Sequence, residues 1–157
     1  MGKFANILNT KKFVVTCEVN PPKGIDLDPL YEKVEMLRGL IDAFNITDSA
    51  GSRMTMAPIG IAHLLLDMGV ESILQITCRD RNRLALQSEL LAAYALGTTN
   101  IICMSGDPPS GGDNPNAKAV FDLDAVSLLR TTTSLQSGTD SAGNDLTGAP
   151  SFCMGAV

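Results

Sequence analysis

Two carboxylates, Glu18 and Asp107, stand where an acidic side chain could take part in a reaction. Each lies at the end of a short apolar run and shortly before two consecutive prolines, so each is expected at the end of a strand. Burial at such a place disfavours the charged form of a carboxyl group, which would suit Glu18 to donate a proton near neutral pH. Gly106 would let the backbone beside Asp107 approach a ligand closely. Simpler roles are an ion pair of Glu18 with Lys23 and a turn formed by Asp107.

Polar residues at two other apolar runs could bind the edge of a heteroaromatic ring. Thr47 and Asp48 end one of these runs, and residues 71–78 carry Gln75 and Thr77. Amide, hydroxyl and carboxylate groups there could form hydrogen bonds with a ligand. Threonine is also common in strands because its β-branched shape packs well there, so each residue alone is a weak indication.

The remaining composition narrows the chemistry. His63 is the only histidine and lies in a predicted helix beside three leucines, which favours a helix-face role over a Ser/His or Cys/His nucleophile. The net charge of −5 and the 4% aromatic content disfavour a nucleic-acid partner. The cysteines fall in predicted strands and form no close Cys-x-x-Cys pair, so we expect buried thiols and no metal, in preference to a four-thiolate zinc site. They are Cys17, Cys78, Cys103 and Cys153.

The length and hydropathy indicate one domain outside the membrane. A chain of 157 residues can bury a sizeable core of its own. The apolar part of residues 1–8 is too short for a signal peptide, and no apolar run approaches the roughly 20 residues of a membrane span. We therefore expect a cytoplasmic protein.

Strands and helices are expected to alternate along the chain. After a polar lead-in over residues 1–12, the patterns predict strands at 13–19, 43–47, 71–78, 101–104 and 150–157. They predict helices from Asp28 as the N-cap to about 40, at 57–67, from 83 to 96, and from Asp124 to about 133. The third helix should bury Leu84, Leu91 and Ala95, with Leu90 and Tyr94 beside them and Gln87 interrupting this face, and the fourth carries Val126, Leu128 and Leu129. Long polar connections are expected at 108–119 and 136–149.

This alternation predicts an α/β protein with parallel strands joined by right-handed crossovers. An open doubly wound sheet and a (β/α)₈ barrel both fit, and the periodicity does not separate them. The chain has no Gly-x-Gly-x-x-Gly after its first strand and no Gly-x-x-x-x-Gly-Lys. Both architectures bind ligands at the carboxyl ends of their strands, which is where Glu18 and Asp107 are expected.

Five segments resemble, in order and spacing, the N-terminal half of 5,10-methylenetetrahydrofolate reductases. They are Cys-Glu-Val-Asn-Pro-Pro at 17–22, Asn-Ile-Thr-Asp-Ser at 45–49, Gln-Ile-Thr-Cys at 75–78, Ile-Ile-Cys-Met-Ser-Gly-Asp-Pro-Pro at 101–109 and Phe-Asp-Leu-Asp at 121–124. The resemblance implies a flavin-binding (β/α)₈ TIM barrel of which residues 13–157 would form the N-terminal half, about four and a half βα units. Such a half would expose two strand edges, so the rest of the barrel would come from further sequence, another chain or a second copy.

The resemblance also implies FAD and a reaction of one-carbon metabolism that serves methionine biosynthesis. Glu18 would be the general acid that opens the imidazolidine ring of methylenetetrahydrofolate to the iminium, which accepts hydride from reduced flavin N5 to give 5-methyltetrahydrofolate. Asp107 would lie near the flavin pyrimidine edge and the pterin, where its negative charge favours the cationic iminium. The positions implied to line the flavin are Thr47, Asp48, Ala50, Gln75, Thr77, Ser105, Gly106, Asp107 and Asp122.

Three of these positions differ from many members of that family. Gln75 replaces a histidine, Ser105 an arginine and Asp48 an aromatic residue. The differences leave the electron donor open between NAD(P)H and an iron–sulfur or corrinoid partner protein, in a homo-oligomer or a hetero-complex. Two other functions also fit the sequence: a non-catalytic scaffold subunit of a one-carbon complex, and a flavin-free pterin-binding methyltransferase barrel.

Overall fold

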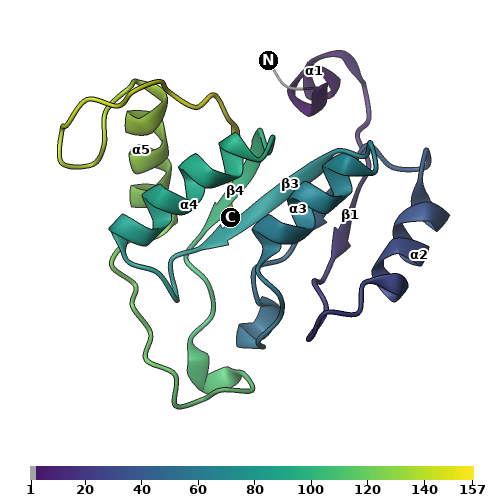
Figure 1. Ribbon diagram of the computed structural model, residues 1–157, viewed down its shortest axis with the longest axis horizontal. Coiled ribbons are helices and arrows are strands. Elements are labelled where there is room, and N and C mark those ends of the chain that lie inside the picture. The colour runs from purple at the N-terminus through teal and green to yellow at the C-terminus, as the bar shows by residue number, and fades with distance from the viewer. Residues whose placement is uncertain (1–2) are drawn as a thin grey trace.

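Five parallel strands form one sheet in the order in which they occur along the chain (Figure 1). The computed structural model describes residues 3–157. All neighbouring strands pair in parallel, and no strand is inserted between two others. A doubly wound sheet reverses its strand order at a switch point, whereas a barrel keeps it sequential, so this α/β fold is consistent with a TIM-barrel-like fragment. The strands are β1 (Thr16–Val19), β2 (Ala43–Ile46), β3 (Ser72–Thr77), β4 (Asn100–Met104) and β5 (Cys153–Ala156).

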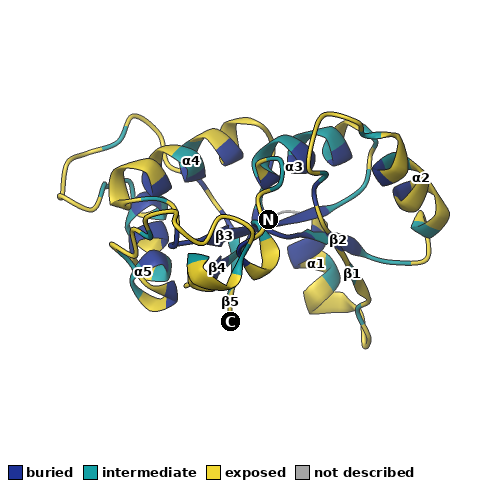
Figure 2. Cartoon of the chain, turned by 90° about the horizontal axis from the view of Figure 1, so that it is seen from below, coloured by how far each residue is buried: buried dark blue, intermediate teal, exposed yellow. Residues whose placement is uncertain are grey.

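Four helices connect the strands and cover one face of the sheet. They are α2 (Asp28–Leu37), α3 (Pro58–Asp67), α4 (Arg83–Ala95) and α5 (Ala125–Gln136). In Figure 2 they follow an arc around the strands. The strand residues in the main apolar core alternate, as in 44 and 46 or 74 and 76, because successive side chains of a strand point to opposite faces. Burial of this face, with Leu65, Leu90 and Leu128 wholly inside, is the main source of stability.

The opposite face, here called the inner face, carries a smaller apolar cluster. Phe4 of helix α1 (Lys3–Thr10) packs there against Ala43 and Ile73. The polar lead-in expected over residues 1–12 thus contains a helix at Lys3–Thr10 that the sequence analysis did not predict, and Met1 and Gly2 lie outside the described residues. The helix is too short for its apolar spacing to stand out, and its contacts with the sheet stabilise it.

Several predicted boundaries shift. The first strand begins at Thr16, three residues later than expected, and Phe13 is 80% exposed. Asp28 lies in the first turn of α2, and Leu27 is the N-cap without a side-chain hydrogen bond, so the predicted capping role of Asp28 is wrong. Asp124 does cap α5, through a reciprocal capping box with Ser127.

Helix α4 buries a face that only partly overlaps the predicted one. Leu90 is buried as expected, but Leu84 is 75% exposed, and Leu86 and Ala93 are buried in addition. Gln87 is also buried, and its amide group is satisfied at both ends. Its Nε2 donates to the carbonyl of Arg83 at 2.9 Å, and its Oε1 accepts from the amide of Ser141 at 2.7 Å. The polar interruption of the helix thus attaches the 136–149 connection to α4. In α5, Leu128 is buried but Val126 is 56% exposed.

All four cysteines are free thiols. Cys78 and Cys103 are buried, as expected, whereas Cys17 and Cys153 are partly exposed. Burial raises the pKa of both buried thiols to about 11, since a thiolate would lose its hydration there. Over residues 3–157, no three acidic, cysteine or histidine side chains gather as a metal site would require. None of the helices described is long and apolar enough to cross a membrane.

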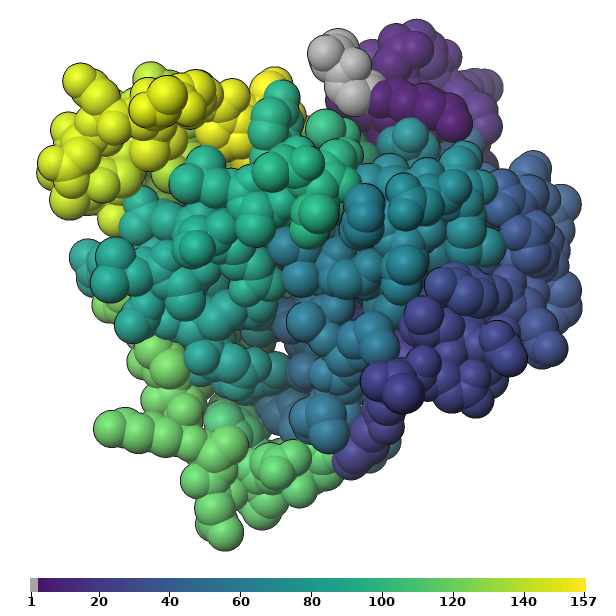
Figure 3. Space-filling view, in the orientation of Figure 1, coloured from purple at the N-terminus to yellow at the C-terminus, as the bar shows by residue number. Residues whose placement is uncertain are grey.

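The carboxyl ends of the strands all lie at one rim, and the loops there are long. The loop after β4 projects beyond the strands in Figure 3, in green at the bottom, with a hollow between it and the loop after β2 in blue. Two short 3₁₀ turns, η1 (Ala50–Ser52) and η2 (Pro109–Gly111), contact each other there. The sheet therefore positions the site chiefly through the loops after β2, β3 and β4.

Candidate functional site

A cavity of about 290 Å³ opens at this rim, and we call it the rim cavity. Side chains and backbone from the ends of β1, β2, β3 and β4 line it. The structure brings together there every residue singled out as a site candidate in the sequence except Asp122. These residues are Glu18, Thr47, Asp48, Ala50, Gln75, Thr77, Ser105, Gly106 and Asp107. Residues that the sequence reasoning did not single out complete the lining: Ser49, Gly51, Arg79, Met104 and Val157.

Four polar side chains of the rim cavity carry no hydrogen bond or ion pair to another residue in the range 3–157. They are those of Glu18, Ser49, Gln75 and Asp107. Gln75 is only 8% exposed as a whole, and its amide keeps both donor and acceptor capacity for a ligand. Glu18 lies on edge strand β1 and is exposed. The burial that we expected to disfavour its charged form is therefore not provided by residues 3–157. Lys23 pairs with Asp113 and not with Glu18, which removes the simple ion pair considered for Glu18.

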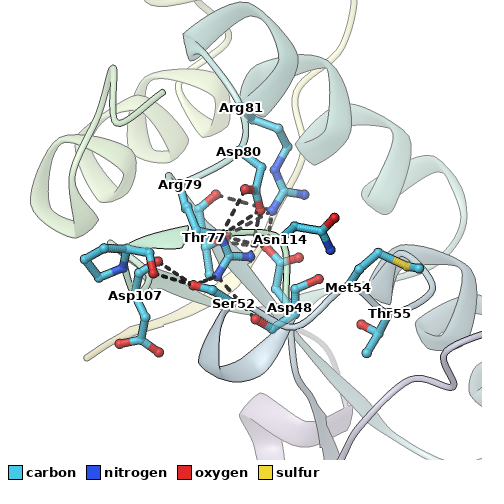
Figure 4. Close-up of polar contacts among 12 residues, drawn as sticks. Asp48, Ser52, Met54, Thr55, Thr77, Arg79, Asp80, Arg81, Asp107 and Asn114 are labelled. Atoms are coloured by element: carbon cyan, nitrogen blue, oxygen red, sulfur yellow. Dashed lines mark hydrogen bonds and ion pairs between the residues drawn. The ribbon is translucent and has the colours of Figure 1, made fainter. Parts of the chain in front are cut away.

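Asp48 holds the ends of β2 and β3 together. Its side chain is buried, and Oδ2 accepts hydrogen bonds from the backbone amide of Thr77 at 2.8 Å and from the Thr77 hydroxyl at 2.9 Å. The guanidinium of Arg81 also contacts this oxygen (Figure 4). The same guanidinium lies 2.7 Å from both carboxylate oxygens of Glu89. Burial lowers the pKa of Arg81, but Asp48 and Glu89 outweigh this effect and leave that pKa above its usual value. Asp48 therefore maintains the shape of the rim.

Arg79, which directly follows the predicted third strand, is 3% exposed. Its Nη1 donates to the carbonyl of Ser49 at 3.2 Å and to the hydroxyl of Ser52 at 3.1 Å, and its Nε and Nη2 contact the carboxylate of Asp80 (Figure 4). The hydrogen bonds that Arg79 donates to the Asp80 carboxylate raise the pKa of Arg79. A charged residue right after a largely apolar run is a signal that could have identified it, because buried charges in proteins are paired.

The loop after β2 has an unusual backbone. Ser49, Gly51 and Ser52 have φ values of 50°, 60° and 57°, in the left-handed region that costs a non-glycine residue free energy. The loop after β4 lies directly against it, since a Cβ atom on Gly112 would stand 1.9 Å from the carbonyl oxygen of Ser52. Strained backbone held by such close contacts is typical of functional sites.

Asp122 lies outside the rim cavity. Its carboxylate accepts hydrogen bonds from Arg83, from the amide at 2.9 Å and from Nε and Nη2 at 2.8 Å. These bonds hold the pKa of Asp122 well below its usual value. The ion pair fixes the start of α4, so this carboxylate is occupied by the protein itself.

The fold is consistent with a TIM-barrel-like fragment, and the rim cavity lies at the carboxyl ends of its strands, where TIM barrels bind their ligands. A family model described as methylenetetrahydrofolate reductase matches residues 3–143. This match covers most of the chain, and the chain belongs to the methylenetetrahydrofolate reductase family. Family membership supports an oxidoreductase-like enzyme of folate one-carbon chemistry, and members generally use a flavin. No curated protein matches the chain.

Proposed function

We propose that this chain binds FAD at the rim cavity and contributes Glu18 and Asp107 to the reduction of 5,10-methylenetetrahydrofolate to 5-methyltetrahydrofolate. The observation that carries the proposal is that some polar side chains of the rim are paired within the protein while others in the same cavity are not. The side chains of Asp48 and Arg79 bind partners within the protein, whereas those of Glu18, Gln75 and Asp107 line the same cavity without partners among residues 3–157. Such a site has a fixed frame with free functional groups.

The residues of the rim cavity fit one edge of a flavin. The amide of Gln75, at the rim cavity, offers a donor and an acceptor side by side, which suits the alternating donors and acceptors of a pyrimidine ring. Met104 and Val157 add apolar contact, and Gly106, with φ of 91°, leaves the backbone accessible where a side chain would collide with Thr77. A volume of about 290 Å³ holds only part of FAD, so we propose that further contacts come from outside the described residues.

Bound in its reduced form, the flavin would supply the hydride. Glu18 would donate a proton to the folate nitrogen that leaves when the imidazolidine ring opens, for which its unpaired carboxyl group is free. Asp107 would stabilise the positive charge that develops on the substrate as the iminium forms, because its carboxylate is a fixed negative charge without an ion-pair partner in residues 3–157. Asp122 has no part in this scheme, since Arg83 occupies its carboxylate.

We further propose that residues 13–157 form the N-terminal half of a (β/α)₈ barrel. The sequential parallel order supports this, and so do the free edges of β1 and β5 at the ends of the sheet. NAD(P)H or an iron–sulfur or corrinoid protein would reduce the flavin. The loss of a histidine and an arginine at positions 75 and 105 changes the charge near the cofactor and therefore its potential.

The experiment that tests the proposal separates two half-reactions in purified protein loaded with FAD. Glu18→Gln should abolish reoxidation of the reduced flavin by methylenetetrahydrofolate and leave reduction of the flavin by its donor largely intact. Glu32→Gln, which changes an exposed glutamate of α2, is the matched control and should affect neither. Equal loss of both half-reactions in Glu18→Gln would remove this residue as the folate's acid.

A further inference from the structure

We propose that Arg79 is a positioning residue that sets the place of Asp107 through the hydroxyl of Ser52. The inference rests on the proposed function, because it concerns how one of its two carboxylates is aimed. Arg79 follows β3, Ser52 lies in the loop after β2, and Asp107 lies in the loop after β4. Three segments distant in sequence are thereby joined in one chain of hydrogen bonds (Figure 4).

The first link is the guanidinium of Arg79. Its Nη1 donates to two groups of the β2 loop, the carbonyl of Ser49 at 3.2 Å and the hydroxyl of Ser52 at 3.1 Å. Asp80 orients the other side of the guanidinium through Nε and Nη2. A forked, nearly fully buried cation of this kind has little freedom, so it fixes where the Ser52 hydroxyl points.

The second link is the Ser52 hydroxyl itself. Because it accepts from Arg79, its own proton is available to the β4 loop, and it lies 2.7 Å from the carbonyl of Asp107 and 3.1 Å from that of Pro108. The backbone of Asp107 is therefore held on one side by this bond. On the other side Gly106 lies so close to β3 that a Cβ atom there would be 3.0 Å from Thr77 Cβ and 3.2 Å from Arg79 Cβ.

The consequence is that the backbone of Asp107 is held in place while its carboxylate is left available to a ligand. The backbone of Asp107 is clamped between Ser52 and β3, while its side chain has no partner among residues 3–157 and borders the rim cavity. A misplacement of about 1 Å in a reacting site can cost about 10²-fold in rate, so the loss of the clamp should be felt in catalysis. A purely structural Arg79 would stabilise the fold without any special link to Asp107.

The test has a structural arm that needs no activity. Hydrogen exchange is measured in the β4 loop, where the amides of Gly111 and Gly112 donate to the carbonyls of Pro108 and Pro109. Arg79→Met and the milder Ser52→Ala should both speed exchange of this loop at least tenfold and leave α5 unchanged. Arg38→Met, which breaks an ion pair with Glu35 outside the rim cavity, is the control and should change neither. If Ser52→Ala leaves the exchange of the β4 loop unaltered, the proposal is overturned.

The kinetic arm asks whether Arg79 acts through Asp107. Arg79→Met should lower folate reduction by about 10²-fold in the parent protein, and by less than about threefold in an Asp107→Asn background. If Arg79→Met lowers the rate of folate reduction by the same factor in both backgrounds, Arg79 does not act through Asp107 and has a general structural role. If Arg79→Met does not fold, Ser52→Ala carries both arms. If the parent protein does not reduce folate at all, the proposed function fails, and the exchange arm still decides the role of Arg79.

Discussion

Replacing Asp48 by asparagine perturbs the most connected polar group of the rim. The buried carboxylate binds Thr77 through two hydrogen bonds and pairs with Arg81, whose side chain is 16% exposed. Removing one partner of a buried pair typically costs 3–5 kcal/mol. Here asparagine can still accept a hydrogen bond from Thr77, and Glu89 still neutralises Arg81, so we expect a loss of about 2 kcal/mol in the free energy of unfolding.

The assay is urea unfolding followed by far-UV circular dichroism. A loss of this size corresponds to a melting temperature lower by about 4–8 °C in a chain of this length. Asp145→Asn is the matched control, because Asp145 is exposed and should change stability by less than about 0.5 kcal/mol. A loss in Asp48→Asn no larger than that of the control would refute the view that Asp48 holds the rim together.

Two further predictions concern charge. Asp107→Asn should slow folate reduction and shift the flavin potential, as followed by stopped-flow absorbance and by redox titration; if both stay unchanged, Asp107 has no part in the mechanism. Burial raises the pKa of Cys78 and Cys103 to about 11, above its value in the unfolded chain. The contribution of these thiols to the free energy of unfolding should therefore be fully present below about pH 9 and be lost as pH rises through 11. Urea unfolding across this pH range should show a smaller fall in Cys103→Ala than in the parent.

The sequence predicts the parallel strands well because apolar runs bounded by turn residues mark them. The periodicity did not separate an open sheet from a barrel, since both use the same alternating units. The sequential strand order now favours the barrel, in agreement with the family resemblance. Two details were not predicted, for a physical reason. Helix α1 is stabilised by contact of Phe4 with Ile73, and the buried face of α4 is set by its place in the main apolar core and by its contact with α5.

The candidate site was predictable in part. Residues at strand ends, such as Glu18 and Gln75, come together because parallel strands end at one rim. The frame residues Arg79 and Ser52 were missed, because their role depends on two loops meeting across β3. No local pattern encodes such a contact. Asp122 was expected near the flavin from the resemblance, whereas here Arg83 engages its carboxylate.

The most direct test of the central claim is a single-turnover measurement on protein loaded with FAD. The flavin is reduced with dithionite under anaerobic conditions, mixed with methylenetetrahydrofolate, and followed by flavin absorbance and by analysis of the folate product. The account predicts that the flavin is reoxidised as 5-methyltetrahydrofolate forms in equal amount, and that Glu18→Gln stops both. Protein that binds no flavin, or bound reduced flavin that persists in the presence of the folate, would contradict it.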